Sequence, residues 1–281
     1  MTPPDRQTTA GRAFLDLRRL AQTTGRATDE LLQLYALEGF LDRLTQSDQR
    51  DHFVLKGGVL LAAYEARRAT RDIDFAARQI ANDLDTMLKA VRTVFAVHLD
   101  DGLTYNPGSL RAQIIREDAN YSGVRITATA ELATARLHFH LDINVGDPIW
   151  PEPTFVALPR LLGTAPIRIV GYPVAMVLAE KIVTAIQRGT ANTRWRDFVD
   201  INTLIVTNPP DPDQLRTASQ RVADHRQATL RPLALVLDGY ATIAQPRWTA
   251  WRRNQRLEAT TPSNFAGLLQ TVIAHVDSLF I

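Results

Sequence analysis

Two aspartates that alternate with apolar residues, one helix-length after a pair of glycines, constrain the fold of this chain more than any other feature. Gly57 and Gly58 end an apolar run, and Asp72 and Asp74 follow after a spacer of thirteen residues. In a β-strand, residues i and i+2 point to the same face, so the two carboxylates would lie together while the apolar residue after each enters a core. Clustered acids repel each other unless a cation lies between them, and Mg²⁺ ions commonly fill that role where phosphates are handled. The pattern predicts a strand that carries a metal site.

Composition narrows the class of protein. The chain has 281 residues, of which 45% are apolar, and this suits a folded chain of one or two domains. No apolar run approaches the roughly 20 residues that a membrane helix needs, and the N-terminal stretch lacks the apolar core of a secretory signal. There is no cysteine, which excludes disulfides and thiolate metal sites. We therefore expect a cytoplasmic protein with no membrane partner.

The charge balance limits how the chain could bind nucleic acid. The formal net charge is only +2, so any contact with RNA must depend on local basic clusters. One cluster lies at Arg67–Arg71, close to the predicted acid strand, and a second at Arg247–Arg256 interleaves arginines with two tryptophans. Each has an alternative interpretation: a solvated helix end for the first, and a helix that buries its tryptophans for the second.

The periodicity of apolar residues predicts an α+β protein. Helices are expected over 8–24, 27–45, 58–67, 83–95, 174–189, 196–206, 212–225, 231–243, 246–257 and 264–280. Strands are expected over 52–55, 71–76, 110–116, 123–129, 137–145 and 167–170. Three prolines near residue 150 interrupt the chain. We expect a first domain over residues 1–155, with a mixed sheet and helices on one or both faces, and a mainly helical domain over 156–281.

The glycine pair, the spacer and the acid–apolar–acid sequence resemble the signature of the polymerase-β-like nucleotidyltransferase superfamily. In that superfamily the glycines open a helix whose amides hold the phosphates of a nucleotide, two acids bind the metals, and a third acid comes from a neighbouring strand. Downstream, Glu180–Ala185 and Arg194–Asp200 resemble the later motifs of the AbiEii/AbiGii-type nucleotidyltransferase toxins, which act in two-gene toxin–antitoxin systems. The resemblance covers roughly residues 50 to 205.

The resemblance implies a set of site residues and cofactors. The implied metal ligands are Asp72, Asp74 and Asp142. The implied catalytic residues are Asp72, Asp74, Lys181 and Asp197, and the implied nucleotide-binding residues are Gly57, Gly58, Lys181 and Thr184. Two Mg²⁺ ions are the expected cofactors, and a nucleoside triphosphate is the expected substrate. Asp200 stands as an alternative to Asp197, which is favoured because it directly follows Arg196 as in the family motif.

Several neighbouring residues have open interpretations. Asp147 competes with Asp142 as the third acid, although its Gly-Asp-Pro setting favours a turn. His138 and His140 share strand parity with Asp142, which is consistent with either a substrate contact or a polar sheet face. Lys56 precedes the glycine pair and is expected to be an ordinary surface lysine. We interpret Thr70 mainly as a strand-entry residue, although its hydroxyl could lie beside the metal site.

The implied function is the toxin half of a toxin–antitoxin pair. Such an enzyme transfers NMP from NTP to an RNA acceptor, with the tRNA 3′ end as the leading candidate, and would thereby block aminoacylation and translation. The implied partners are the NTP, the RNA and a cognate antitoxin protein. Two alternatives remain: nucleotidyl transfer to a small molecule or a protein, and a non-catalytic interaction protein that kept the fold.

Overall fold

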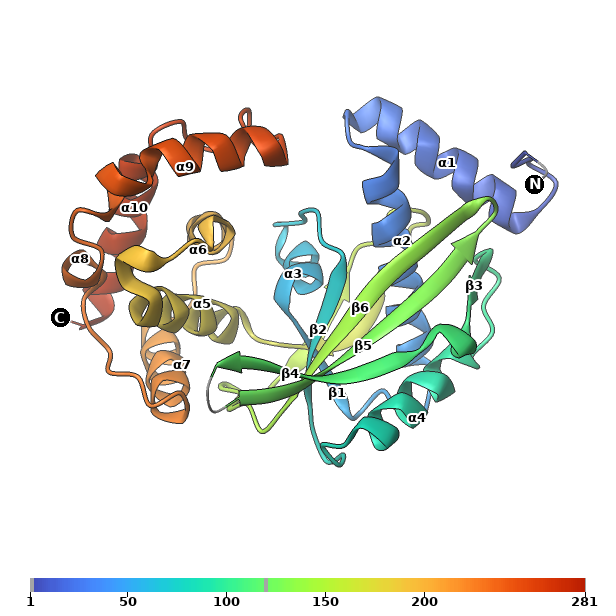
Figure 1. Ribbon diagram of the computed structural model, residues 1–281, viewed down its shortest axis with the longest axis horizontal. Coiled ribbons are helices and arrows are strands. Elements are labelled where there is room, and N and C mark those ends of the chain that lie inside the picture. The colour runs from blue at the N-terminus through green and yellow to red at the C-terminus, as the bar shows by residue number, and fades with distance from the viewer. Residues whose placement is uncertain (1–2, 119–120, 281) are drawn as a thin grey trace. The chain divides into compact units, whose positions relative to one another are not determined.

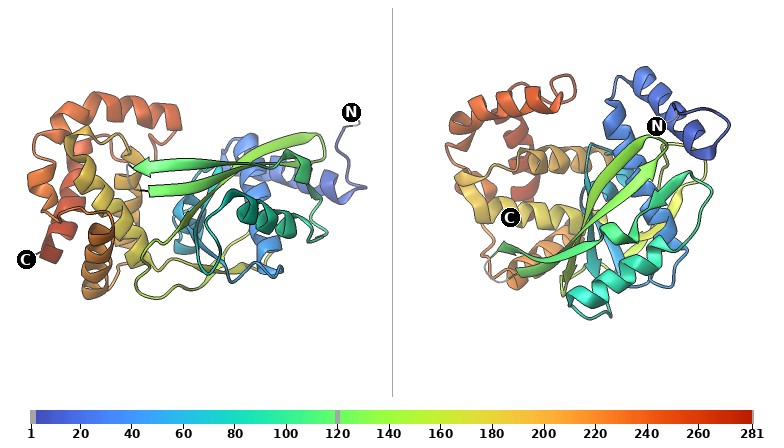
Figure 2. Two further views of the ribbon diagram at one scale, coloured as in Figure 1. Left: turned by 60° about the horizontal axis from the view of Figure 1, so that its bottom comes forward. Right: turned by 45° about the vertical axis from the view of Figure 1, so that its right-hand side comes forward.

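Within the described residues, eight strands form one mixed sheet, in which the strand that carries Asp72 and Asp74 has a central place (Figure 1). The computed structural model describes residues 3–118 and 121–280. The strands are β1 (Phe53–Lys56), β2 (Asp72–Ala77), β3 (Leu103–Tyr105), β4 (Arg111–Asp118), β5 (Tyr121–Leu132), β6 (Ala135–Val145), β7 (Thr154–Leu158) and β8 (Ile167–Gly171). Their order is β3-β5-β6-β2-β1-β8-β7, and β4 pairs with β5. β2 runs parallel to β6 and antiparallel to β1, while the long strands β5 and β6 lie side by side as a hairpin (Figure 2).

Alternation along β6 separates a core face from a polar face of the sheet. Phe139, Leu141 and Ile143 are fully buried, as are Ile73 and Phe75 of β2 to within 1%. This face is covered by two helices, α2 (Thr28–Thr45) and α4 (Leu84–Phe95). The apolar face removes its side chains from water, which is the main stabilising term of such a layer. The acids occupy the opposite face of the same strands.

Phe40 of α2 joins the two central strands at the core. Its ring centroid lies 6.3 Å from that of Phe75 and 6.2 Å from that of Phe139. α2 follows α1 (Thr9–Thr24), whose first turn is capped by Thr8 and whose end has Gly25 in the left-handed region. Both helices agree with the sequence prediction to within one residue at each end.

The glycine pair opens a shorter helix than the sequence predicts. The predicted helix over 58–67 is a four-residue helix, α3 (Gly57–Leu60), followed by a 3₁₀ turn (Leu61–Tyr64). Glu65 ends the turn with φ +58°, and its N–H bonds to the carbonyl of Leu61. The tertiary reason is a hydrogen bond that Tyr64 Oη donates to the carbonyl of Tyr172 at 2.5 Å, which ties the turn to the segment after β8. The short strands β3 and β7 have no counterpart in the prediction.

The remaining helices follow β8. They are α5 (Val174–Arg188), α6 (Trp195–Thr207), α7 (Pro212–His225), α8 (Leu233–Val236), α9 (Tyr240–Gln255) and α10 (Phe265–Asp277). The boundary between the predicted helices over 231–243 and 246–257 was wrong. The helical structure is interrupted at Gly239, and α9 then continues without a break past Pro246. Gly239 adopts φ +70°, a conformation that glycine takes without steric cost. An aromatic cluster built on Tyr240, stacked 5.8 Å from Trp195, forms the core of these helices.

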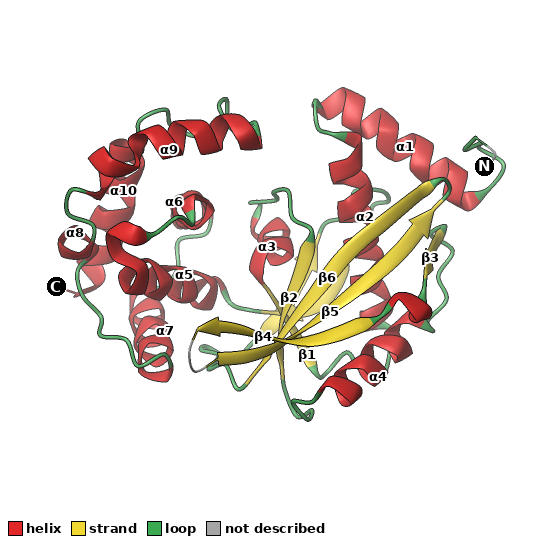
Figure 3. Ribbon diagram, viewed as in Figure 1, coloured by secondary structure: helices red, strands yellow, loops and turns green. Residues whose placement is uncertain are grey.

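Contacts divide the chain into two compact units. The first contains residues 1–147 and 153–172, and the second contains 148–152 and 173–281. All strands of the described residues belong to the first unit, and the described part of the second is helical (Figure 3). The sequence-based boundary after residue 155 differs from this division, because β8 pairs with β1 and so keeps residues 156–172 with the sheet. The α+β fold class is confirmed. No helix within the described residues is long and apolar enough to cross a bilayer.

Candidate active site

The three acids predicted as metal ligands lie on one face of two neighbouring strands. Asp72 and Asp74 are two residues apart on β2 and are partly exposed. In the parallel register of β2 and β6, Asp74 is the partner of Asp142, and Asp72 is the partner of His140. Paired positions on adjacent strands project to the same side of a sheet. The register therefore gathers carboxylates from segments about seventy residues apart in the chain.

The glycine turn lies directly against one of these acids. Gly57 adopts φ +66°, and a Cβ at this position would lie 1.8 Å from Oδ2 of Asp74. A Cβ on Gly58 would lie 3.0 Å from the hydroxyl oxygen of Thr70. Glycine is thus required at residue 57 both by its backbone conformation and by the space that the Asp74 carboxylate occupies. The turn brings backbone amides to the acid face, as phosphate binding would need.

Arg125 is a residue of this face that the sequence analysis missed. It lies on β5 as the register partner of Asp142, its Nε donates to Oδ1 at 2.7 Å, and its Nη2 donates to Oδ2 at 2.7 Å. The hydrogen bonds from Arg125 to Asp142, together with the charges of Asp142, Asp72 and Asp74, raise the pKa of the guanidinium despite some desolvation. The alternation of residues along the strand could have indicated that residue 125 faces the polar side. Its contact with Asp142, however, depends on the register of the β5–β6 hairpin.

The donor chemistry of the acids fits a divalent cation, since Mg²⁺ prefers carboxylate oxygens. Within the described part of the chain, however, no three acidic or histidine side chains converge closely enough to hold an ion as they stand. Both oxygens of Asp142 accept hydrogen bonds from Arg125. The three carboxylates are the kind of ligand that Mg²⁺ prefers. Asp72 and Asp74 lie on one face of β2, and Asp142 lies beside Asp74 on β6.

Two further contacts support the acid face. The hydroxyl of Thr70 donates to Oδ1 of Asp72 at 2.5 Å, so this residue does lie beside the acids. Lys56, expected on the surface, is instead only 7% exposed, and its Nζ lies 2.7 Å from Oδ2 of Asp147. This ion pair engages Asp147, and Lys56 is itself the register partner of Asp74 on β1. The expectation of a surface lysine was wrong because the loop after β6 returns to the end of β1.

Polar side chains continue along the same sheet face beyond Asp142. His138 and His140 alternate on β6, and each has a threonine of β5 beside it. The distance between Thr129 Oγ1 and His138 Nδ1 is 3.1 Å, and that between Thr127 Oγ1 and His140 Nδ1 is 3.3 Å. This face therefore offers hydrogen-bonding groups, whereas the opposite face is apolar.

The second unit brings together Lys181 of α5 and two acids of α6. Lys181 Nζ donates to Oδ1 of Asp197 at 2.7 Å and to Oδ2 of Asp200 at 2.8 Å, so both alternatives from the sequence contact the lysine. Arg194 Nε donates to the other oxygen of Asp197 at 2.6 Å. Burial would raise the pKa of Asp197, but the charges of Lys181 and Arg194 and their hydrogen bonds outweigh it and lower the pKa. Asp197 is thus held as an anion.

Thr184 lies one turn after Lys181 but has different partners. Its hydroxyl donates to the carbonyl of Glu180 at 2.7 Å and accepts from Nη1 of Arg226 at 2.9 Å. The structure therefore pairs Thr184 with a guanidinium at the end of α7. Arg226 carries no motif that the sequence analysis could recognise.

The arginine–tryptophan segment of α9 is largely a packing element. Trp248 is fully buried, and its indole N–H donates to the carbonyl of Pro262 at 3.1 Å. Arg252 is 7% exposed and donates to Thr261 and to the carbonyl of Glu258. These observations favour the interpretation of a helix that buries its tryptophan over that of a nucleic-acid surface.

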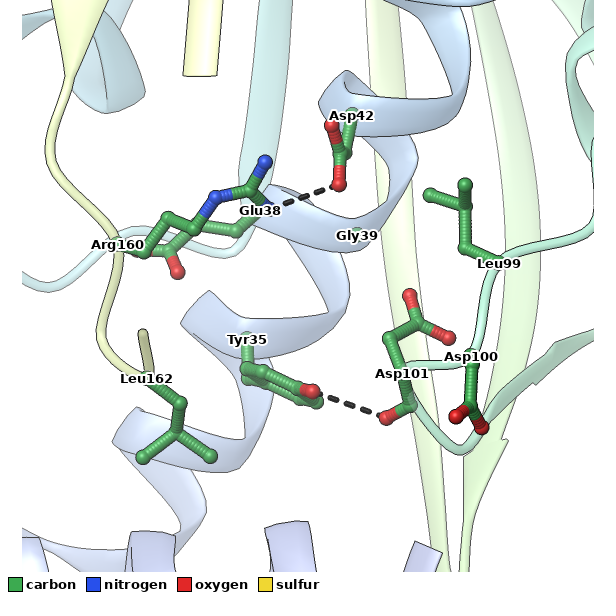
Figure 4. A pocket seen from close by; sticks show the side chains of 9 residues that line it. All are labelled: Tyr35, Glu38, Gly39, Asp42, Leu99, Asp100, Asp101, Arg160 and Leu162. Atoms are coloured by element: carbon green, nitrogen blue, oxygen red, sulfur yellow. Dashed lines mark hydrogen bonds and ion pairs between the residues drawn. The ribbon is translucent and has the colours of Figure 1, made fainter. Parts of the chain in front are cut away.

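A separate pocket of about 320 Å³ lies between α2 and the loops near residues 100 and 160 (Figure 4). Its lining residues are Tyr35, Glu38, Gly39, Asp42, Leu99, Asp100, Asp101, Arg160 and Leu162. Arg160 Nη1 donates to Oδ2 of Asp42 at 2.8 Å, and Tyr35 Oη donates to the carbonyl of Asp101 at 2.9 Å. Burial, followed by the charges of Asp101 and Glu38, raises the pKa of Tyr35 to about 12. The acids that line the pocket are largely engaged by arginines, so we assign it a structural role.

Comparisons with known proteins bear on the identity of the chain. The model of the nucleotidyl transferase AbiEii toxin family, of type IV toxin–antitoxin systems, matches residues 39–271. The crystal structure of JHP933 from Helicobacter pylori is similar, with a TM-score of 0.51 and 12% identity over 86% of this chain and 88% of that chain. A second H. pylori structure gives a TM-score of 0.51 and 12% identity over 90% of this chain and 95% of that chain. No curated protein matches the chain.

The two kinds of comparison carry different weight. At 12% identity the solved structures show the fold alone. The family match, in contrast, spans well over half of the chain and includes the glycine pair, the acids and the lysine of α5. It confirms the resemblance stated from the motifs, so the chain belongs to the AbiEii family of nucleotidyltransferase toxins from type IV toxin–antitoxin systems.

Proposed function

We propose that the protein transfers a nucleoside monophosphate from an NTP to an RNA acceptor, with the tRNA 3′ end as the preferred acceptor. The observation that carries the proposal is the register of β2 and β6, which places Asp142 beside Asp74 next to the Gly57 turn. A transferase needs such an arrangement because its catalysis consists mainly of positioning and charge stabilisation.

Asp72, Asp74 and Asp142 would hold two Mg²⁺ ions. When bound, the ions would supply the charge that favours ionisation of the acceptor hydroxyl and neutralises the pyrophosphate. The acceptor hydroxyl gives up its proton to water, and its oxygen forms a bond to the α-phosphorus. The bond from this phosphorus to the bridging oxygen breaks, and pyrophosphate leaves with that electron pair. Backbone amides at Gly57 and Gly58 would contact the triphosphate, which the absence of a Cβ permits.

Lys181 would neutralise triphosphate charge, and Asp197 would position it. Both oxygens of Asp197 are engaged, by Lys181 and by Arg194, and its pKa is lowered. A carboxylate with a lowered pKa is a weak base, so we favour the positioning role over that of general base. Thr184 would contribute to nucleotide binding indirectly, because its hydroxyl accepts a hydrogen bond from Arg226 and so positions that guanidinium.

The acid face also suggests the acceptor class. His138, His140 and the two threonines beside them extend the face from Asp142 with hydrogen-bonding groups. Unpaired RNA ends are recognised by hydrogen bonds to base edges and by stacking on rings such as imidazole. A surface of this kind suits a single-stranded 3′ end better than a small, enclosed substrate. As the toxin of a pair, the protein would act inside the cell and be neutralised by a cognate antitoxin protein.

The test is nucleotide transfer by the purified protein. Each labelled NTP is supplied in turn together with Mg²⁺ and total RNA. We expect label to appear in tRNA with at least one of the four NTPs. Asp72→Asn and Asp74→Asn should lower the rate by roughly a hundredfold or more, the scale of removing one electrostatic contributor. The exposed Asp85→Asn in the first turn of α4 is the matched control and should retain the rate.

Three outcomes would contradict the proposal. Label that enters only the protein or a small molecule would support those acceptors instead. Transfer by a folded Asp72→Asn at the wild-type rate would refute the role of the acid face. Absence of any labelling, combined with equal effects of wild type and Asp72→Asn on cell growth, would favour a non-catalytic protein.

A further inference from the structure

Arg125 binds the two oxygens that a cation at Asp142 would need. The two hydrogen bonds, from Nε and from Nη2, are both 2.7 Å long. Such bidentate pairs between a guanidinium and a carboxylate are among the strongest and most directional ion pairs in proteins. The carboxylate of Asp142 is 8% exposed, and the Arg125 side chain is 36% exposed, so the pair is sheltered at its acidic end.

The guanidinium also lies in the field of the whole acid face. Asp142 is the nearest anion, and the charges of Asp72 and Asp74 act on Arg125 in the same direction. Three carboxylates on neighbouring strands would repel one another, and a fixed cation lowers that repulsion. Arg125 therefore performs in the described structure the electrostatic role that a divalent cation would perform when bound.

The two cations would repel each other at the same oxygens. Mg²⁺ binds carboxylate oxygens at about 2.0–2.1 Å, so an ion on Asp142 would lie close to the guanidinium and oppose its hydrogen bonds. We propose that Arg125 is the built-in counter-ion of Asp142 and competes with the divalent cation for that carboxylate. This inference rests on the proposed function, since it takes Asp142 to be a ligand. Its consequence is that the nucleotide-free enzyme binds metal weakly at Asp142.

Release of the guanidinium has a further consequence. A displaced arginine loses two charge-assisted hydrogen bonds and needs another anion, and the triphosphate is the anion that a nucleotidyltransferase brings to this face. Metal and nucleotide should therefore promote each other's binding in the wild type. The two effects are equal by thermodynamic linkage, so either can be measured.

The test is a titration of the whole protein with Mn²⁺ in the absence of nucleotide, with free Mn²⁺ followed by its electron paramagnetic resonance signal. Arg125→Met should bind Mn²⁺ roughly tenfold or more tightly than the wild type, as expected when a charged hydrogen-bonded competitor is removed. Arg125→Lys, which keeps the charge but not the planar fork, should lie between the two. Circular dichroism would verify that each variant is folded.

Two controls separate direct competition from a general change of charge. Arg111 lies on β4 opposite Thr127 and bonds to backbone carbonyls of Gly108 and Leu110, so Arg111→Met removes the same charge from the same sheet without touching an acid. It should leave Mn²⁺ affinity within about twofold, because exposed charges at a distance are screened. In an Asp142→Asn background, Arg125→Met should give no further gain.

Unchanged or weaker Mn²⁺ binding by Arg125→Met would overturn the inference, as would an equal gain in Arg111→Met. Should neither the wild type nor Arg125→Met bind Mn²⁺, the inference also fails. These outcomes are independent of the acceptor, because the titration contains neither nucleotide nor RNA. If the protein labels RNA but Arg125→Met does not bind Mn²⁺ more tightly, only this inference is refuted. If Arg125→Met binds Mn²⁺ more tightly but the protein labels no RNA, only the proposed acceptor is refuted.

Discussion

At the scale of single residues, Asp197 of the helical unit forms ion pairs with two cations. Its carboxylate is 7% exposed and accepts from Lys181 at 2.7 Å and from Arg194 at 2.6 Å. Removing one partner of such a buried pair leaves the other charge uncompensated, which costs more than the pair itself contributes. The stability of the helical unit and the proposed positioning of Lys181 therefore depend on the same carboxylate.

The lowered pKa of Asp197 predicts how stability depends on pH. Because the folded pKa lies below the ordinary value of about 3.9, the unfolded chain binds more protons at acid pH. The contribution is thus present above about pH 4 and is lost as pH falls through the folded pKa. Asp197→Asn should cost about 1–3 kcal/mol of unfolding free energy at pH 7. The difference from wild type should shrink toward pH 3, as measured by urea unfolding across that range.

A control for this series is the exposed Asp224→Asn of the same unit, which should change the free energy of unfolding by less than about 0.5 kcal/mol at pH 7. A difference between wild type and Asp197→Asn that is as large at pH 3 as at pH 7 would show that the carboxylate does not act through its charge.

At the scale of elements, two glycines distinguish a packed strand from an open helix surface. A Cβ at Gly171 of β8 would lie 2.9 Å from Leu60 Cδ1 of α3 and 3.0 Å from Val156 Cγ2 of β7, so this position is closely packed. Gly267 of α10 is exposed and has nothing within 4 Å of its Cβ position. The same substitution should therefore act in opposite directions.

Gly171→Ala should lower the free energy of unfolding by about 1–3 kcal/mol, because overpacking forces neighbouring side chains to move. Gly267→Ala should raise it by about 0.5–1 kcal/mol, because alanine restricts the unfolded chain and favours the helix. Both variants can be compared by calorimetry at one scan rate. A stabilising Gly171→Ala would mean that β8 packs less closely against α3 and β7 than the structure shows.

At the scale of the whole molecule, the two units have separate cores that can be followed separately. All four tryptophans, at 150, 195, 248 and 251, belong to the helical unit, and the sheet unit contains none. Tryptophan emission therefore reports on the second unit, while far-ultraviolet circular dichroism reports on both. Domains with their own cores commonly unfold in separable transitions.

Phe139→Ala removes a fully buried ring from the core of the sheet unit and should cost about 3–5 kcal/mol there. We expect the circular-dichroism transition of this variant to move to lower urea concentration, while the midpoint from tryptophan emission changes little. An equal shift of both probes would show instead that the units unfold together.

The sequence was sufficient for features that depend on neighbours along the chain. The alternation at Asp72 and Asp74 predicted a strand with acids on one face, and the periodicity around Leu31–Leu41 predicted α2. Side-chain direction repeats every two residues in a strand and every 3.6 in a helix, so both patterns are visible locally. The α+β class followed from such patterns and the family from the resemblance of the motifs to known ones, and both are confirmed.

Only the tertiary structure decided which distant residues meet. The pairing of Asp142 with Arg125 and the burial of Lys56 against Asp147 both depend on contacts between segments that local patterns do not connect. A shift of two residues in strand register would keep each side chain on its own face of the sheet, yet it would place a different side chain beside each acid. Register is set by packing of the whole sheet, and this is why the charge partner of the acid face could not be predicted from the chain alone.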